Sequence, residues 1–580
     1  MRRLALVALG LAACVGGAAD ETPALPVPPP TDFCDTDLSE VASCDAPSAA
    51  GVGSPAECEA MVRDALSWAS CHGLLMHARL PEEYTQRGDA PLLVHAPFAL
   101  TPAEFPASAF ERALALAPLF NKLAEAVAAD LPWLERTLQS SASSDDFTRR
   151  LLKLAARVKR EPSTQRAKLM ILRSDYMLHG DPTGDGADRG VSRNPPQPHL
   201  FQIELNTIAA SFASLSSKVS QLHATLAQRF LALRRHLWEH RGRPHKLRLD
   251  DAVPPNPSLT RIAAALAAAY KSYGVDDALV IFVVQPDEQN AVNLELLRST
   301  LWANHGVRVI CRTLAQLEIE ARLVGSARKL MLGGKAADTK KVPAKEVAVA
   351  YFRAGYTPDD FPSGREWNAR LAVERSHAIK CPSIECHLAG AKRVQQQLSV
   401  PGELERFVSE KEAALLRQVF AGLWALDGPD RVRDASNDAE REAAAAIASA
   451  RAAPEGFVMK PQREGGGHNL FGDELAKTLG SLSRPQRASF ILMQRLRPPA
   501  YPAMLVCEGQ LQRGEAVSEL GVYSTYVRAA NGKVLVDGAV GHLLRSKLVG
   551  TDEGGVAAGY ACLSSPLASL AAIAAHPKKG

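Results

Sequence analysis

The segment from Phe457 to Gly472, FVMKPQREGGGHNLFG, combines groups that suit phosphate chemistry. Three consecutive glycines follow a lysine, an arginine and a glutamate, directly after a short apolar run. Glycine lets a ligand approach the backbone closely, and successive backbone N–H groups in such a turn bind anions. The segment therefore predicts a phosphate site in which Lys460 supplies positive charge and Glu464 holds a metal ion. Taken alone, it is more typical of a surface hairpin than of a phosphate site.

Three other segments place polar residues where apolar runs end. In QIELNT, Glu204 and Asn206 are two residues apart and therefore share one face of a strand. Hard oxygen ligands at this spacing suit Mg²⁺, which takes few protein ligands together with phosphate oxygens. In HLLRSK, Arg545 and Lys547 have the same spacing, and EGGVAAG (Glu553–Gly559) is a second glycine-rich loop. Each segment alone is typical of a strand edge or a surface turn, but together they predict a site for ATP and a metal ion.

Hydrophobic spacing predicts the elements that must position these residues. Apolar residues recur every three or four positions in several helical stretches, and they are more continuous in two strands that end in polar residues. The expected helices begin near Pro55 and cover Glu111–Ala129, Asp145–Arg160 and Leu215–Arg235, and the expected strands cover Ala167–Leu178 and His199–Ile208.

A smaller α/β unit is expected in the middle of the chain. The apolar run Asp276–Gln285 suits a buried parallel strand, and a helix (Asn290–Asn304) and a strand (Val307–Thr313) complete a βαβ unit. Lys345–Tyr356 adds a further strand. We predict an N-terminal extension (1–54), a first part of the main domain (55–274), an inserted smaller domain (275–390) and a second part of the main domain (391–580).

The C-terminal part is expected to change from helices to strands. AKRVQQQLS and Asp438–Ala453 predict helices, and the glycine segment predicts a strand, a turn and a second strand. ASFILMQRL, VSELGVYSTYVR and KVLVDGAVGHLLRSK are strand-rich and suit an antiparallel sheet. The fold class is therefore α/β or α+β with an inserted domain.

Composition excludes some classes of partner. The 580 residues are 46% hydrophobic and 22% charged, which is typical of a globular protein of two or three units. The formal net charge is +4, from 67 basic and 63 acidic residues, so there is no global field to attract nucleic acid. The ten cysteines form no CxxC pair and no zinc-type cluster, and a reducing compartment is the simpler interpretation.

The N-terminal residues are set apart by their composition. MRRLALVALGLAACVGGAAD has a basic start, an apolar run and small residues, as a secretory signal or another targeting segment does. The apolar run is too short for a convincing membrane span. The proline-rich stretch ETPALPVPPPTDF then predicts an extended linker. Residues 1–54 are therefore predicted to be a targeting and linker extension.

Nine segments occur in an order that resembles eukaryotic-type glutathione synthetase, between about Pro55 and Ser564. They are LRSDYM, QIELNTIAASF, YFRAGY, ERSHAIKCP, LAGAKRVQQQLS, KPQREGGGHNLFG, SELGVY, GHLLRSK and EGGVAAG. The resemblance implies an ATP-grasp fold with an inserted substrate-binding domain, a homodimer, and ATP- and Mg²⁺-dependent ligation of γ-glutamylcysteine to glycine. In that reaction the cysteinyl carboxylate is phosphorylated, and the glycine amine then displaces phosphate from the acyl phosphate, leaving ADP, phosphate and glutathione.

The resemblance also implies roles for individual residues. Arg173 is the implied catalytic residue, a permanently charged donor beside the transferred phosphoryl group. The implied ligands of two Mg²⁺ ions are Glu204, Asn206 and Glu464. The implied ATP contacts are Lys392, Lys460, Gly465, Gly466, Gly467, Asn469, Phe471, Met493, Gln494, Glu519, Lys547 and Glu553. The implied dipeptide contacts are Arg173, Ser211, Glu288, Asn290, Arg353, Tyr356, Arg545, Val556 and Ala557.

Four positions depart from the pattern of the family. Phe471 stands where a tyrosine is expected, Gln494 where a glutamate is expected, and Glu553 where an aspartate is expected. A glutamine expected downstream of EQN is missing, and Leu294 or Glu295 stands nearby. The metal, lysine and arginine positions are all retained, so an active enzyme is predicted.

Two alternatives differ in function. One is a related ligase that uses β-alanine or serine as the acceptor, and the other is an inactive ATP-binding scaffold. Ala557 and Ala558 favour glycine, and the retained metal and phosphate residues favour catalysis. A reaction that needs ATP and a reduced thiol favours the cytosol or a plastid-like organelle.

Overall fold

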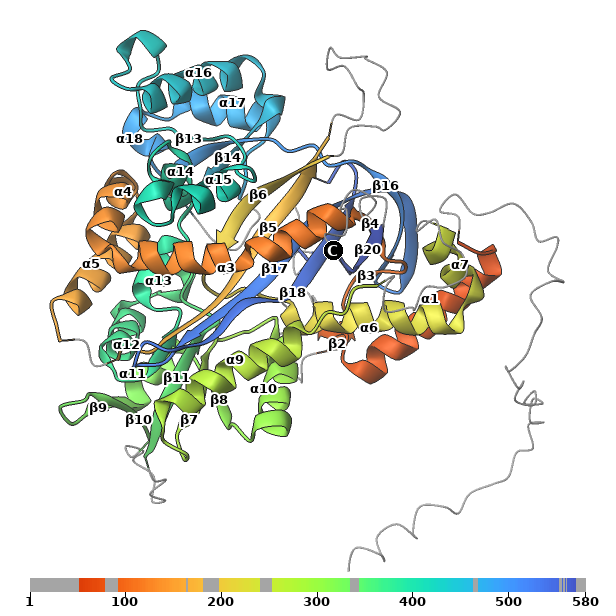
Figure 1. Cartoon of the computed structure of the whole chain (residues 1–580), viewed down its shortest axis with the longest axis horizontal. Coiled ribbons are helices and arrows are strands. Elements are labelled where there is room, and N and C mark those ends of the chain that lie inside the picture. The colour runs from red at the N-terminus through yellow and green to blue at the C-terminus, as the bar shows by residue number, and fades with distance from the viewer. Residues whose placement is uncertain are drawn as a thin grey trace, which may run out of the picture. The chain divides into compact units, whose positions relative to one another are not determined.

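A seven-stranded sheet forms the centre of the protein (Figure 1). The computed structural model describes residues 52–78, 92–162, 165–180, 198–239, 253–333, 344–462, 468–551, 555–556, 559 and 561–569. In spatial order the strands are β16 (Tyr501–Cys507), β3 (Phe98–Ala99), β19 (Cys562–Ser564), β18 (Val534–Leu548), β17 (Gln510–Arg528), β5 (Lys168–His179) and β6 (His199–Asn206). All neighbours are antiparallel except β3 and β19.

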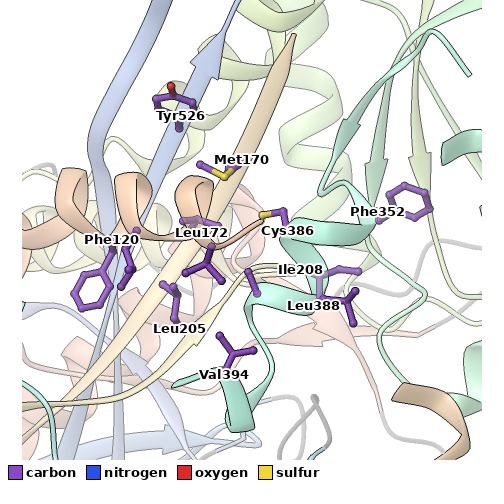
Figure 2. Packing of buried hydrophobic residues seen from close by; sticks show 14 of the residues in the cluster. Phe120, Met170, Leu172, Leu205, Ile208, Phe352, Cys386, Leu388, Val394 and Tyr526 are labelled. Atoms are coloured by element: carbon purple, nitrogen blue, oxygen red, sulfur yellow. The ribbon is translucent and has the colours of Figure 1, made fainter. Parts of the chain in front are cut away.

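Strand β5 shows how this sheet serves two cores and a polar site. Leu172 and Tyr176 face a core that includes helix α3 (Ala107–Ala129), which crosses the sheet against β5, β17 and β18. Figure 2 shows Leu172 in this core together with side chains from α3, β6 and two later helices. On the other face, Leu169 and Ile171 pack in a second core with helices α6 (Ala213–Arg229) and α9 (Ser258–Tyr273). Since alternate residues of a strand share a face, the two positions that continue this second face are Arg173 and Asp175.

The smaller α/β unit predicted in the middle of the chain is present as a six-stranded sheet. Its βαβ unit consists of the parallel strands β7 and β8 with helix α10 between them, and β11 also pairs with β7 in parallel. The elements are β7 (Leu279–Val283), α10 (Ala291–His305), β8 (Val309–Arg312), β9 (Ala321–Val324), β10 (Lys329–Leu332), β11 (Lys345–Phe352) and β12 (Ile379–Cys381).

A three-stranded antiparallel sheet carries the lysine of the first motif. It consists of β13 (Leu423–Ala425), β15 (Phe490–Gln494) and β14 (Phe457–Pro461), with β15 in the middle. Helices α16 (Asp438–Ala452) and α17 (Gly472–Ser481) share its core. Lys460 is therefore held by a small sheet that is separate from the strands of Glu204 and Arg545.

The remaining elements surround these sheets. Helix α1 (Pro55–His72) begins at a capping box, in which the side chains of Ser54 and Glu57 each bond to the other's backbone N–H. The other helices are α4 (Leu131–Ser144), α5 (Asp146–Lys159), α7 (Leu231–Glu239), α11 (Leu314–Glu320), α12 (Gly364–Arg375), α13 (Ile384–Ala389), α14 (Lys392–Ser399), α15 (Glu410–Arg417) and α18 (Arg484–Arg487). Two-stranded sheets form from β1 (Leu75–His77) with β2 (Leu93–His95) and from β4 (Ala103–Pro106) with β20 (Pro566–Ser569). Within the described part of the chain, no helix is long and apolar enough to cross a membrane.

The structure corrects three predictions about elements. The helix predicted over Leu215–Arg235 is divided into α6 and α7 because Phe230 has extended backbone angles (φ −115°, ψ 112°). After the glycine segment, Leu470 forms only an isolated bridge with Met459, and helix α17 follows where a second strand was expected. The three strand-rich C-terminal segments do not share one sheet, since β15 lies in the small sheet. The predicted domain boundaries stay predictions.

Candidate active site

The register of β18, β17, β5 and β6 brings six polar side chains onto one face of the large sheet. Residues opposite each other in an antiparallel ladder share a face, and so do alternate residues of one strand. We call this set the charged face, and its opposed pairs are Glu519 with Arg545, Asp175 with Glu204, and Arg173 with Asn206.

Asp175 is the centre of the charged face. Its carboxylate is fully buried and accepts hydrogen bonds from Arg173 Nε and Nη2 at 2.6 and 2.7 Å. It also accepts from Asn206 Nδ2 at 3.1 Å and from Arg545 Nη2 at 3.3 Å. Asp175 was not predicted from the sequence, although its position two residues after Arg173 places it on the same face of the strand.

A glycine makes room for this ion pair. Gly521 of β17 lies opposite Asp175 in the ladder. A Cβ at this position would lie 2.8 Å from Asp175 Oδ1 and 2.9 Å from Arg173 Cδ, closer than real Cβ contacts. The glycine in SELGVY therefore leaves space for the side chains of Arg173 and Asp175 over β17 while β17 and β5 stay paired.

Glu204 lies in a strongly positive environment. Burial opposes its ionisation, but Lys392 and Lys460, followed by Arg173 and Arg545, lower the pKa of Glu204 to about 2. Lys392 Nζ, at the first residue of α14, lies 3.7 Å from Glu204 Oε2. Glu204 is therefore a carboxylate throughout the physiological pH range, as a ligand for a hard cation must be.

A cavity of about 410 Å³ opens between the charged face and the small sheet. Seven of the implied ATP contacts line it: Lys460, Asn469, Phe471, Met493, Gln494, Glu519 and Lys547. Arg545, implied as a dipeptide contact, also lines the cavity, which places one of the two predicted carboxylate partners beside the nucleotide residues. The cavity thus brings together side chains from both sheets, as ATP binding requires.

Two departures from the family pattern lie on the wall of this cavity. Gln494 Oε1 accepts a hydrogen bond from Gly422 N at 3.2 Å, so the amide that replaces a carboxylate is tied to neighbouring backbone. The ring of Phe471 lies 5.2 Å from the guanidinium carbon of Arg495. The wall keeps an aromatic face without a hydroxyl group at position 471.

A second polar group lies at the start of α6. Buried Arg353 donates from Nη1 to Ala210 O at 2.7 Å and from Nη2 to Ser211 Oγ. Tyr523 donates its hydroxyl to Ser211 O and lies opposite Arg173 in the ladder of β17 with β5. The implied dipeptide residues Ser211 and Arg353 are therefore joined to the charged face through Tyr523.

The start of α10 completes this second group. Asn290 N donates to Glu288 Oε1 at 2.9 Å. Burial raises the pKa of the Tyr356 phenol, and the neighbouring carboxylate of Asp360 raises it further. Sequence reasoning missed Asn293, whose Oδ1 accepts from Ser214 N at 3.0 Å and so fixes the start of α6 against α10.

The missing glutamine has no substitute at either neighbouring position. Leu294 is buried in the second core, where its side chain contributes to packing. Glu295 pairs with Arg298 at 2.7 Å and is 54% exposed. Neither residue therefore supplies the side-chain amide that the family pattern has here.

Several predicted residues lie outside the described part of the chain. They are Glu464, Gly465, Gly466, Gly467, Glu553 and Ala557. Val556 is described, and its side chain is buried in the second core.

Comparisons with known proteins agree with this geometry. The family described as "Eukaryotic glutathione synthase, ATP binding domain" matches residues 55–568. The chloroplastic glutathione synthetase of Arabidopsis thaliana is 40% identical over 512 residues, covering 87% of this chain and 84% of the relative. The glutathione synthetases of Homo sapiens and Dictyostelium discoideum are 36% and 34% identical over 88% and 87% of this chain, and over 96% and 97% of their own lengths.

One solved structure has the same fold. It is a glutathione synthetase-like effector from Globodera pallida in its apo form, with a TM-score of 0.64 and 20% identity over 89% of this chain and 98% of that chain. This likeness supports the ATP-grasp fold, and the family match supports an ATP-dependent ligase. The chain belongs to the eukaryotic glutathione synthase family.

Proposed function

We propose that this protein joins γ-glutamylcysteine to glycine and converts ATP to ADP and phosphate in the same reaction. The observation that carries the proposal is the charged face, where Arg173 and Arg545 share one buried carboxylate beside a cavity lined by Lys460 and Lys547. Cations held in place before the substrate arrives stabilise negative charge without reorganising during the reaction.

The chemistry requires two displacements. A carboxylate is a poor electrophile, because its leaving group would be oxide. In the first step a cysteinyl carboxylate oxygen attacks the γ-phosphorus of ATP, and ADP leaves. In the second step the glycine amine attacks the acyl carbon, and phosphate leaves with the bonding electrons while the amine loses a proton. We assign to Arg173 the binding of the transferred phosphoryl group and of the tetrahedral intermediate, because its guanidinium is a permanently charged planar donor.

We assign the ATP contacts to the cavity. In this assignment Lys460 and Lys547 bind phosphates, and Lys392 lies beside Glu204. The glycines 465–467 and Glu553, which are not among the described residues, are proposed as further nucleotide contacts. Met493, Phe471 and Gln494 form a wall for the base, and Asn469 and Glu519 provide polar contacts.

Glu204 and Asn206 fit a magnesium site. Their side chains lie side by side on β6, where Asn206 Nδ2 donates to Glu204 Oε1 at 3.3 Å; the Glu204 carboxylate and the Asn206 amide oxygen are the proposed ligands, with Glu464 as the third. Bound Mg²⁺, with two ions per site proposed, neutralises the charge of the phosphates. We expect Glu464→Gln to abolish turnover while the protein stays folded by circular dichroism. Unchanged turnover would contradict the metal assignment.

We assign the dipeptide to the group at the start of α6. Arg353 and Arg545 suit its carboxylates, and Glu288 with Asn290 suits its ammonium group. Ser211, Tyr356, Val556 and Ala557 complete the contacts.

Phosphate release tests the reaction and its acceptor together. The full chain receives ATP, Mg²⁺ and γ-glutamylcysteine with glycine, β-alanine, serine or no acceptor. We expect release with glycine to exceed release with each other acceptor by at least about tenfold, because an added methylene or hydroxyl group must be accommodated in a small site. Preference for β-alanine or serine would overturn the assignment of glycine as the acceptor. No phosphate release with any acceptor would overturn the proposal that the protein is an active ligase.

We also propose that the protein is a homodimer. Leu92, which precedes β2, and Leu93 and Val94 within it are 55, 46 and 39% exposed, and such an apolar patch is a typical contact surface. Sedimentation of the wild type and of Leu93→Asp tests this, since a monomeric wild type would contradict it.

We propose that residues 1–54 direct the protein to a plastid-like organelle, as the chloroplastic names of two relatives suggest. A fluorescent protein fused after residue 54 tests this. Cytosolic fluorescence would favour the alternative.

A further inference from the structure

Two cysteines from distant parts of the sequence meet beside the candidate active site. Cys507 Sγ at the end of β16 lies 3.2 Å from Cys562 Sγ at the start of β19. Both are free thiols, and they lie with Ala99, Ala503 and Leu505 in a small apolar cluster. A disulfide requires an S–S distance of about 2.05 Å, so the sulfurs need to approach by about 1.2 Å to form one.

The two thiols differ in the way that an attacking and a resolving thiol must differ. Cys507 is half-buried, whereas Cys562 is only 2% exposed. The hydrogen bond from the Cys562 thiol lowers the pKa of Cys507, and the same contact together with burial raises the pKa of Cys562. The thiolate is the nucleophile in disulfide exchange, so Cys507 is the thiol that reacts first.

The pair is directly connected to the charged face. Cys562 lies opposite Ser546 in the ladder of β19 with β18, and Leu563 lies opposite Arg545. Ala561, the residue before Cys562, lines the nucleotide cavity. A change in the position of β19 therefore reaches both Arg545 and the wall of the cavity.

We propose that Cys507 and Cys562 form a thiol–disulfide switch that lowers the activity of the neighbouring site when it is oxidised by a low-molecular-weight disulfide. This effect on activity rests on the proposed function. The Cys507 thiolate attacks one sulfur of the small disulfide. This attack joins Cys507 to that sulfur in a mixed disulfide and releases the other half as a thiolate. Cys562 then attacks the Cys507 sulfur and releases the second small thiol. Two protein thiols are oxidised, one small disulfide is reduced to two thiols, and the two protons pass to these thiols.

The product of the proposed reaction is itself a thiol. If the protein makes glutathione, the oxidant is the disulfide of its own product, and reduced glutathione reverses the reaction. The activity of the site then follows the ratio of the two forms.

The test uses the full chain and glutathione disulfide. The protein is incubated with excess glutathione disulfide, alkylated, unfolded and digested, and we expect mass spectrometry to find the peptide that joins Cys507 to Cys562. We expect kcat/KM for ATP to fall at least about threefold, because a displacement of about 1 Å in a site can reduce the rate by up to about 100-fold. A thiol reductant should restore it.

Two variants provide the matched comparison. Cys507→Ser should keep the activity of the reduced wild type and become insensitive to glutathione disulfide. Cys71→Ser, which removes an exposed thiol of α1, should remain sensitive. Calorimetry measures the ATP affinity of the oxidised and reduced protein and detects the switch even if no acceptor is ligated. Failure of the proposed reaction is therefore distinguishable from failure of the switch.

Three results would overturn the proposal. They are absence of the joined peptide, a mixed disulfide at Cys507 that does not proceed to the joined form, and a joined form with unchanged kcat/KM and ATP affinity.

Discussion

The charged face of the large sheet and the inner side of helix α12 both bury arginine, but they differ in how the charge is neutralised. Arg173 and Arg545 share Asp175, and Arg545 lines a cavity. Arg370 of α12 pairs with Glu374 on the same helix at 2.8 Å, and its guanidinium carbon lies 3.7 Å from the centroid of the Phe352 ring. The side chains of that pair are 1 and 2% exposed. Arg545, with a side chain that is 17% exposed, is available to a ligand, whereas both members of the Arg370–Glu374 pair are closed off from solvent.

The largest effect should come from breaking the closed pair. Arg370→Met leaves Glu374 buried without its partner, which costs about 3–5 kcal/mol of unfolding free energy. Urea denaturation measures this loss, and kcat of the folded fraction should not change. The double variant Arg370→Met/Glu374→Leu should recover most of the stability. A loss of unfolding free energy below about 1 kcal/mol, which is typical of an exposed ion pair, would contradict the description of Arg370 and Glu374 as a buried pair.

The charged face should show the opposite pattern. Arg173→Lys keeps the charge but loses the planar donor, and we expect kcat/KM to fall by about 10²–10³, as for loss of one donor to a transition state. The free energy of unfolding should change by at most about 1.5 kcal/mol, the value of a typical hydrogen bond. Steady-state kinetics and urea denaturation of the same preparation measure both quantities. Unchanged kcat/KM would show that Arg173 is as structural as Arg370.

Gly521 tests whether the geometry of the shared pair matters. Gly521→Ala adds a methyl group 2.8 Å from Asp175 Oδ1, so the Arg173–Asp175 pair must shift. We expect about a tenfold fall in kcat/KM, within the range for displacements of about 1 Å in a site. Gly480→Ala is the matched control, because its Cβ would meet nothing within 4 Å. Equal activity of the two variants would show that the pair tolerates displacement.

The same contrast explains how much of the site the sequence could predict. Alternation within a strand correctly placed Glu204 beside Asn206, because a period of two is a local property. The opposition of Glu519 to Arg545 depends on the register of distant strands, which no local pattern determines. Asp175 was missed because a single sequence does not distinguish an aspartate at a functional site from an aspartate that only pairs with a structural arginine. Phe230 has no helix-breaking chemistry of its own, so the division between α6 and α7 follows from tertiary packing.

The smallest effect should come from the link between the charged face and the second polar group. Tyr523 is buried, and its hydroxyl donates to Ser211 O, whose side chain accepts from Arg353. Tyr523→Phe keeps the ring and removes one hydrogen bond, which contributes about 0.5–1.5 kcal/mol. If this bond positions the dipeptide site, KM for γ-glutamylcysteine should rise by about 2- to 10-fold while KM for ATP stays constant. Tyr270→Phe is the control, because it also removes a hydroxyl that donates to a backbone carbonyl, but that carbonyl belongs to Asp276 and not to Ser211, so both KM values should stay unchanged. An equal rise in both KM values for Tyr523→Phe would mean that the hydroxyl supports the sheet as a whole, and the two groups of the site would then be independent of each other.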